Sequence, residues 1–300
     1  MAENSAISWT DDTASPWRGC QEVRIVLPDG THVPSECDKC YARNLTRGPR
    51  MGYDGHDADH PDVWGNPKTT PRLRNKYPQA MLRKINRQAI EEGRRLLFTA
   101  SMSDLFEDHP MVEQWRQDYL VWCELATHVD HLFLTKRPQN VLRMVPQYWL
   151  DHWPQNVWLG YSAGTVAAMG RRAKWGERWR AFGVPVVFVS IEPQLEAVDA
   201  TLAIECGANW LIVGGESGQD GLPDERDRID ADPDWFRQVR DVAVARGVPF
   251  FFKQSSGVRP GSGTTLDGRR WYQWPDTQLG PVSGVRAKPG AELIALRGRA

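Results

Sequence analysis

Three cysteines near the N-terminus are the residues whose types and spacing most clearly suggest chemistry. Cys20, Cys37 and Cys40 form a C-x16-C-x2-C pattern, and Tyr41 directly follows the last of them. A C-x2-C pair lets two thiolates reach one metal from a single turn, and a thiolate from a nearby loop adds a third ligand. Thiolates are soft ligands that suit zinc and iron–sulfur clusters. The pattern therefore predicts a metal centre on these three sulfurs.

The number of ligands leaves two metals open. A structural zinc site needs four protein ligands, and His32, His56 and His60 are candidates for the fourth. A [4Fe–4S] cluster normally takes four thiolates, so a set of three would leave one iron open to an exogenous ligand. Zinc and a cluster with an open iron are therefore alternatives.

Composition places the chain among globular proteins of a reducing compartment. The 300 residues include five cysteines, and the polar, acidic N-terminus lacks the features of an export signal, so we expect reduced thiols and a cytoplasmic protein. No run approaches the roughly 20 apolar residues of a membrane span, so no membrane partner is expected. The net charge of −1 does not indicate a polyanion partner, although a local basic patch remains compatible with it.

Short, almost continuously apolar runs alternate with helical segments along most of the chain. Such runs are typical of strands buried on both faces of a parallel sheet. They are Leu96–Ser101, His131–Thr135, Val157–Tyr161, Val186–Ile191, Trp210–Val213 and Val248–Phe252, with Ser15–Gly19 as a candidate first strand. Helices are predicted at Gln79–Gly93, Val112–Thr127 and Asp234–Arg246. The alternation predicts an α/β fold, either a complete or incomplete parallel (β/α) barrel or, as the competitor, a doubly wound sheet.

The remaining segments are predicted to be less regular. Residues Gly48–Pro78 are rich in Pro, Gly, His and Asp and are expected to form a long loop. The tail from Ser255 is predicted to form loops with an edge hairpin around Trp271–Trp274. We therefore expect a barrel domain over residues 1–254 and a C-terminal extension over residues 255–300.

Several motifs together resemble a phage and prophage family of three-cysteine proteins that are similar to radical S-adenosylmethionine (SAM) enzymes. The matching blocks are Ile7–Asp11, Pro16, Gly19–Cys20, Cys37–Ala42, Ser101–Phe106, Thr135–Pro138, Asn156–Gly160, Ser190–Pro193, Val213–Gly218 and Phe251–Gln254. Two segments depart from the family pattern. Gln21–Glu36 looks like an inserted loop or hairpin that turns at Pro28–Gly30, and Tyr161–Gly164 lacks the polar residues expected there.

The resemblance implies a barrel of radical SAM type and a specific chemistry. A [4Fe–4S] cluster on Cys20, Cys37 and Cys40 would receive an electron from an external donor and cleave SAM to a 5′-deoxyadenosyl radical. The phage context implies a nucleobase, nucleotide or nucleic acid as substrate. The alternative is a zinc-stapled, non-catalytic protein of phage origin that binds nucleic acid or another partner.

The matched blocks fall at the carboxyl ends of predicted strands, where barrel enzymes collect their functional residues. The resemblance implies that Ser101, Ser103 and Asp104 contact the cofactor and that Tyr41 lies near its adenine; a helix N-cap (Ser103, Asp104) and plain packing (Tyr41) are the alternatives. The complete predicted cofactor set is Tyr41, Ser101, Ser103, Asp104, Gly214, Gly215, Glu216 and Lys253. The predicted catalytic set is Glu192, Lys136 and Arg137. Lys136 and Arg137 are cations that can bind a carboxylate or phosphate, and Glu192 can act as a general acid or base. The glycines allow a ligand to approach the backbone closely.

Overall fold

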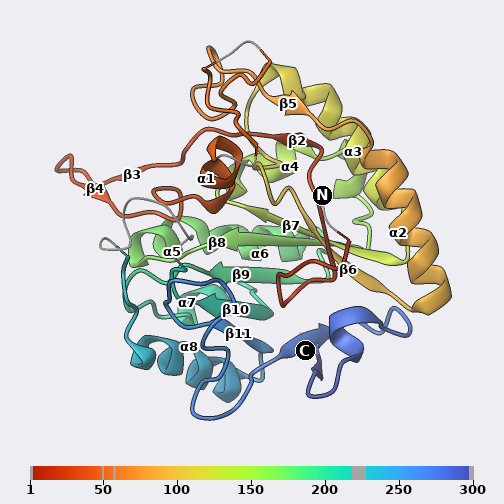
Figure 1. Cartoon of the computed structure of the whole chain (residues 1–300). Coiled ribbons are helices and arrows are strands. Elements are labelled where there is room, and N and C mark those ends of the chain that lie inside the picture. The colour runs from red at the N-terminus through yellow and green to blue at the C-terminus, as the bar shows by residue number, and fades with distance from the viewer. Residues whose placement is uncertain (1–2, 49–50, 57–58, 218–227, 297–300) are drawn as a thin grey trace.

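The computed structural model describes residues 3–48, 51–56, 59–217 and 228–296. Within these residues, seven parallel strands form one sheet in the order β1-β6-β7-β8-β9-β10-β11 (Figure 1). They are β1 (Asp12–Ala14), β6 (Arg95–Thr99), β7 (Val129–Thr135), β8 (Val157–Ser162), β9 (Val187–Ile191), β10 (Trp210–Gly214) and β11 (Phe250–Gln254). The six apolar runs from Leu96 onward are confirmed as strands, and nearly every residue in them is buried.

The first strand lies earlier than predicted. Strand β1 pairs with β6 and ends at Ala14, whereas Ser15–Gly19 was expected to form the strand. Pro16 explains the difference, because proline has no amide hydrogen to donate within a sheet. The chain after it forms the short β2 (Trp17–Arg18), which pairs antiparallel with β5 (Leu73–Arg74) outside the main sheet.

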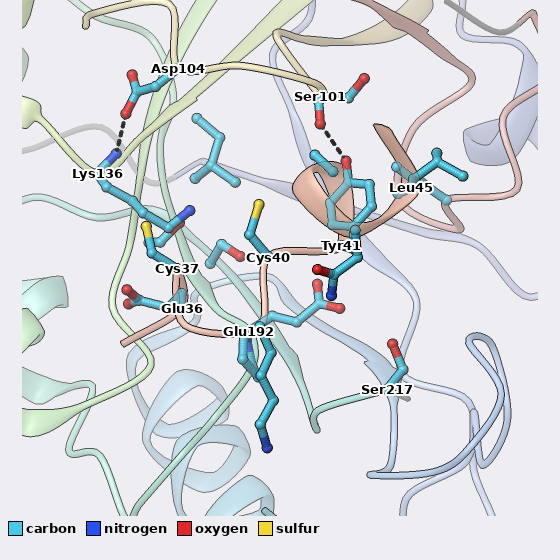
Figure 2. Close-up of a pocket in the computed structure, with 18 of the residues that line it drawn as sticks. Glu36, Cys37, Cys40, Tyr41, Leu45, Ser101, Asp104, Lys136, Glu192 and Ser217 are labelled. Carbon is cyan, nitrogen blue, oxygen red and sulfur yellow. Dashed lines mark hydrogen bonds between the residues drawn. The ribbon is translucent and has the colours of Figure 1, made fainter. Parts of the chain in front are cut away.

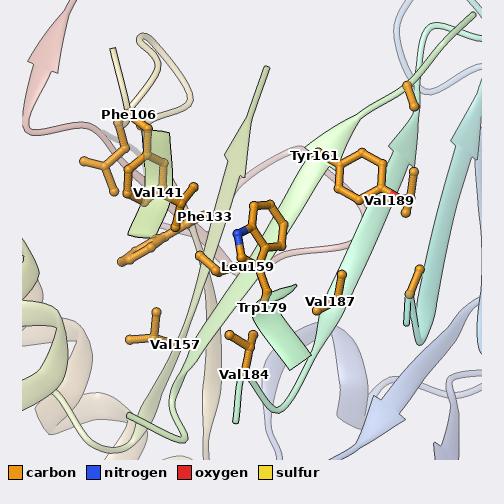
Figure 3. Close-up of a cluster of buried hydrophobic side chains, with 14 of the residues drawn as sticks. Phe106, Phe133, Val141, Val157, Leu159, Tyr161, Trp179, Val184, Val187 and Val189 are labelled. Atoms are coloured by element: carbon orange, nitrogen blue, oxygen red, sulfur yellow. The ribbon is translucent and has the colours of Figure 1, made fainter. Parts of the chain in front are cut away.

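The helices between the strands pack against one face of the sheet. Strands adjacent in sequence are also neighbours in space, so right-handed connections place their helices on the same side. They are α2 (Pro78–Glu92), α3 (Glu113–Leu125), α4 (Val141–Met144), α5 (Val166–Arg172), α6 (Lys174–Ala181), α7 (Thr201–Glu205) and α8 (Pro233–Arg246). The three predicted helices correspond to α2, α3 and α8. Figure 3 shows part of this core, where Trp179 of α6 meets Leu159 and Val187 of the sheet. No helix among the described residues combines the length and apolar character needed to cross a bilayer.

The opposite face is packed with aromatic side chains and covered by the two ends of the chain. Trp158, Phe188 and Trp210 form its centre, and the ring centroids of Trp158 and Trp210 lie 6.1 Å apart. Trp9 and Trp274 close over them, with the Trp274 indole donating a hydrogen bond to the Trp9 carbonyl at 3.2 Å. The C-terminal segment therefore takes the position that a second layer of helices would occupy in a doubly wound fold.

The prediction of a complete or incomplete barrel of radical SAM type is wrong. The sheet is open: β1 and β11 are its two edges, and no pairing among the described residues joins them. The reason lies in the aromatic face, whose large side chains fill the space that a curling sheet would enclose. Asp130 strengthens this arrangement, because it is fully buried on β7 and pairs with Arg94 and with Arg286 of the C-terminal segment.

Several smaller elements surround the sheet. The segment Gln21–Glu36 contains the predicted hairpin, in which β3 (Ile25–Val26) and β4 (His32–Val33) pair antiparallel and project from the body (Figure 1). The predicted edge hairpin near Trp271–Trp274 is wrong, because β12 (Gln273–Asp276) pairs in parallel with β13 (Glu292–Ala295). Helix α1 (Tyr41–Arg47) follows the cysteine pair. The 3-10 turns are η1 (Pro110–Val112), η2 (Pro138–Asn140), η3 (Gln147–Leu150) and η5 (Gly284–Ala287).

Candidate functional site

The aromatic face becomes polar toward the carboxyl ends of the strands. Alternate residues of a strand point to the same face, so on β9 Phe188 is followed by Ser190 and, just beyond the strand, by Glu192. Lys136 after β7, Ser162 of β8 and Lys253 of β11 add polar groups at the same edge. A cavity of about 710 Å³ opens there, with Trp9, Phe98 and Leu134 among its apolar lining residues.

All of the predicted site residues except Gly214 line this one cavity. They are Cys20, Cys37, Cys40, Tyr41, Ser101, Ser103, Asp104, Lys136, Arg137, Glu192, Gly215, Glu216 and Lys253. Figure 2 shows several of them converging from different elements. Residues separated by more than 200 positions in the sequence meet here because the carboxyl ends of parallel strands share one edge.

The three cysteines lie together in one wall of the cavity. Cys20 follows β2, and Cys37 and Cys40 flank the turn that leads into α1. All three also line a second, smaller cavity of about 220 Å³, so the sulfurs stand between two open spaces. Burial raises the pKa of the Cys20 thiol well above its ordinary value, and the negative charge of Cys40 raises it further, although Arg137 opposes both effects.

The three sulfurs do not form a compact single-ion group in the described part of the chain. Tetrahedral bonds of about 2.3 Å to one zinc would place the sulfurs only about 3.8 Å apart. In the described part of the chain, three ligand atoms of His, Cys, Asp or Glu lie mutually within 4.8 Å only at Glu22, His32 and Asp38, and the cysteines form no such group.

None of the histidines considered as a fourth ligand lines either cavity. The exposed His32 groups with the half-buried Glu22 and Asp38, and His56 lies 3.6 Å from Asp54. Both Asp38 oxygens accept hydrogen bonds from Ser35, at 2.9 and 3.1 Å. The predicted donor set at the cavity therefore stays at three thiolates.

Buried charges outside the predicted set hold the cysteine segments in place. Glu36, next to Cys37, accepts a hydrogen bond from the Gly164 amide at 2.8 Å and pairs with Arg172 of α5 at 3.1 Å. Burial raises the pKa of Glu36, but the charges of Arg172 and Lys136 and the Gly164 amide outweigh burial and keep it below its usual value. On the other side, the Gln21 amide donates to Glu107 at 2.5 Å. These roles were not predicted from the sequence, where the one available signal was the position of charged residues beside the cysteines.

Asp104 and Arg137 are occupied by protein partners. The Asp104 carboxylate accepts hydrogen bonds from the Thr135 hydroxyl at 2.7 Å and the Lys136 amide at 3.1 Å, and it pairs with Arg137 at 2.8 Å. Arg137 also donates to the Gln21 carbonyl at 2.5 Å. The two residues therefore tie the ends of β6 and β7 to the Cys20 segment. The alternative that Ser103 and Asp104 cap a helix is wrong, because the next helical turn begins at Pro110.

Other charged residues of the cavity form pairs across it. Glu192 pairs with Lys253, joining the ends of β9 and β11. Lys39 lies between Cys37 and Cys40 in the sequence. Its ammonium nitrogen is 3.4 Å from a carboxylate oxygen of Glu216, which follows β10. These pairs connect the cysteine segment and the far strands around one opening.

The hydroxyl groups of Tyr41 and Ser103 differ in whether they have a hydrogen-bond partner. The Tyr41 hydroxyl donates to the Ser101 carbonyl at 2.6 Å, while its ring stays half exposed at the cavity. Ser103 lines the cavity, and its buried hydroxyl has no hydrogen-bond partner among the described residues.

The glycines of the 213–218 block serve the protein's own packing. An added Cβ at Gly215 would lie 2.2 Å from the Ser256 amide nitrogen, so this glycine admits neighbouring backbone as well as lining the cavity. Gly214 packs near Glu192 behind the cavity wall. Gly218 lies outside the described residues.

Comparison with known proteins places the chain in one family. The model of the family described as "Protein of unknown function (DUF5131)" matches residues 4–275, which include every residue of the candidate site. No curated protein and no solved structure matches the chain. The geometry of the cavity therefore carries the functional argument.

Proposed function

From the premise that this chain belongs to the DUF5131 family, we propose that it is a radical SAM-type enzyme. Cys20, Cys37 and Cys40 would hold a [4Fe–4S] cluster, and SAM would bind beside it in the large cavity. The observation that carries the proposal is a set of three cysteines that together line two adjoining cavities, while none of His32, His56 and His60 lines either one. The proposal depends on this site and not on a closed barrel.

The cluster and SAM together supply one-electron chemistry that ends in hydrogen abstraction from a substrate. The protein's own part is to position the cluster and SAM and to exclude water from the site. Glu36 and Glu107 fix the segments that carry the thiolates, and the Asp104–Arg137 pair fixes the loop after β6. The Tyr41 ring at the cavity and the Ser103 hydroxyl, buried and without a partner among the described residues, would be the protein's contacts to a bound ligand. An external low-potential electron donor completes the requirements, and reduced thiols fit a cytoplasmic location.

The cavity also bears on the substrate. Its volume of about 710 Å³ lies in the range of small-molecule sites, with room for a cofactor and a second compact molecule. A duplex cannot enter such a space, whereas a free nucleotide or a base turned out of a strand can. We therefore propose a nucleobase or nucleotide as substrate. Binding of a polymer substrate would weaken steeply with added salt, because phosphate contacts release counterions.

Metal analysis of protein purified without oxygen tests the cluster. We expect about four iron and four sulfide per chain in the wild type, and much less in C20S, C37S and C40S. C123S is the matched control, because Cys123 is fully buried on α3 and lines neither cavity, and it should keep the wild-type iron content. Wild-type protein that carries zinc and no sulfide would overturn the proposal.

Circular dichroism of C37S separates the two predicted roles of the centre. If the centre is a catalytic cluster and the sheet folds without it, C37S should lose the cluster with little change in its circular dichroism spectrum. A structural zinc centre is coupled to folding, so C37S would then lose ordered structure. SAM cleavage by the reduced wild type, measured as release of 5′-deoxyadenosine, is the functional readout.

A further inference from the structure

Lys136 differs from the other cations of the cavity wall. Lys39, Arg137 and Lys253 each lie in an ion pair with a carboxylate. No carboxylate oxygen in the described part of the chain lies within 4.0 Å of the Lys136 ammonium. A half-buried ammonium without a carboxylate partner needs another negative group nearby.

The nearest carboxylates already have other partners. Glu36 pairs with Arg172, and Asp104 pairs with Arg137. Figure 2 shows the Lys136 side chain extending from the end of β7 toward Cys37 and Cys40. Lys136 and all three cysteines line the same cavity. When the cysteines hold a cluster as thiolates, their sulfurs would therefore be the negative groups that the ammonium faces without a competing direct ion pair.

We propose that Lys136 is the counter-charge of the three-cysteine centre and raises the reduction potential of the cluster held there. This inference rests on the proposed function. A cluster on three thiolates gains one further negative charge when a low-potential donor reduces it by one electron. A fixed cation beside the sulfurs stabilises the reduced state more than the oxidised state, and screening is weak where solvent is excluded. Lys136 is thus a positioning residue for charge and is distinct from a group that reacts with substrate.

The test compares K136M and K136R with the wild type, each reconstituted with iron and sulfide without oxygen. Potentials are measured by titration with dithionite and mediators, followed by electron paramagnetic resonance of the reduced cluster. We expect K136M to shift the reduction equilibrium at least tenfold toward the oxidised state, a fall of about 59 mV for one electron. K136R retains the charge and should therefore keep most of the wild-type reduction potential. K174M, an exposed lysine of α6, should match the wild type.

The possible outcomes separate this inference from the proposed function. If the wild type binds no iron and sulfide, both fall together. If the wild type binds the cluster and K136M has the same potential, Lys136 is not the counter-charge and the proposed function stands. If K136M does not assemble a cluster, K136Q serves as a second neutral variant; assembly in K136R alone supports the charge role. Failure of K136R as well, in folded protein, would show that the shape of the lysine matters and would overturn the proposal.

Discussion

The two faces of the central sheet differ in how their character changes along the strands. On β9, Val187, Val189 and Ile191 face the helices and all are fully buried and aliphatic. The alternate residues of the same segment run from Phe188 through Ser190 to Glu192. A face covered by helices along its full length must stay apolar throughout. The other face is covered by the chain ends at one end only, so its other end is available for polar groups and a cavity.

The largest expected effect comes from the attachment of the C-terminal segment to the aromatic face. D130N would leave Arg94 and Arg286 buried without their anion, so the free energy of unfolding should fall by about 3–5 kcal/mol. Urea denaturation followed by fluorescence measures the change. D108N removes a comparable but exposed pair with Arg143 and should cost at most about 1 kcal/mol. Equal effects of the two variants would show that the aromatic face does not depend on this anchor.

The second largest loss of stability is expected at the Glu36–Arg172 ion pair, which joins the cysteine segment to helix α5. E36Q keeps the shape of the side chain but leaves Arg172 without its charge partner, so we expect a loss of about 3 kcal/mol and a reduced iron content. E22Q, at the other end of the same insertion, alters only longer ion pairs to Arg24 and Arg43 and should cost less than about 1 kcal/mol. Iron retention in E36Q equal to that in E22Q would argue against Glu36 as the anchor of Cys37.

Close packing on the aromatic face predicts a cost at Gly160. An added Cβ would lie 2.3 Å from the Phe188 ring, so G160A should lower the free energy of unfolding by about 2 kcal/mol through overpacking. The G160A/F188L double variant should cost less than the sum of the single variants, because the smaller side chain relieves the clash. G170A, a helical glycine with no neighbour within 4 Å, should instead raise stability by about 0.5–1 kcal/mol. Additive costs for Gly160 and Phe188 would exclude the contact as the cause.

The smallest effect is a pH dependence from the helix face. Burial, together with the charge of Arg94, lowers the pKa of His131 to about 3, whereas the unfolded chain has a pKa of about 6.5. The unfolded state therefore binds more protons as the pH falls below about 6.5, and stability declines in that direction. Between pH 7 and pH 5.5 this group should remove about 1.3 kcal/mol. H131L should lose less stability than the wild type over the same interval by that amount; parallel pH curves would contradict the assignment.

Local patterns in the sequence were enough to predict most of the elements. Apolar runs and helical periodicity identified β6 to β11 and helices α2, α3 and α8. Pro16 shows the limit of the apolar-run criterion, since one residue without an amide hydrogen moved the first strand to Asp12–Ala14. Short helices such as α7 (Thr201–Glu205) escaped detection because five residues give too little periodicity.

What the sequence determined by itself was which residues could do chemistry: the three cysteines and the polar groups that follow each strand. Those properties are local, because residue type and spacing along the chain fix them. Only the tertiary structure decided that the sheet stays open, because aromatic side chains and a C-terminal segment more than 100 residues away from β7 fill its second face. It also decided which charges neutralise one another. Asp104 and Glu36 are held by arginines while Lys136 is left facing the sulfurs, and such partners depend on distances in space that spacing along the chain does not contain.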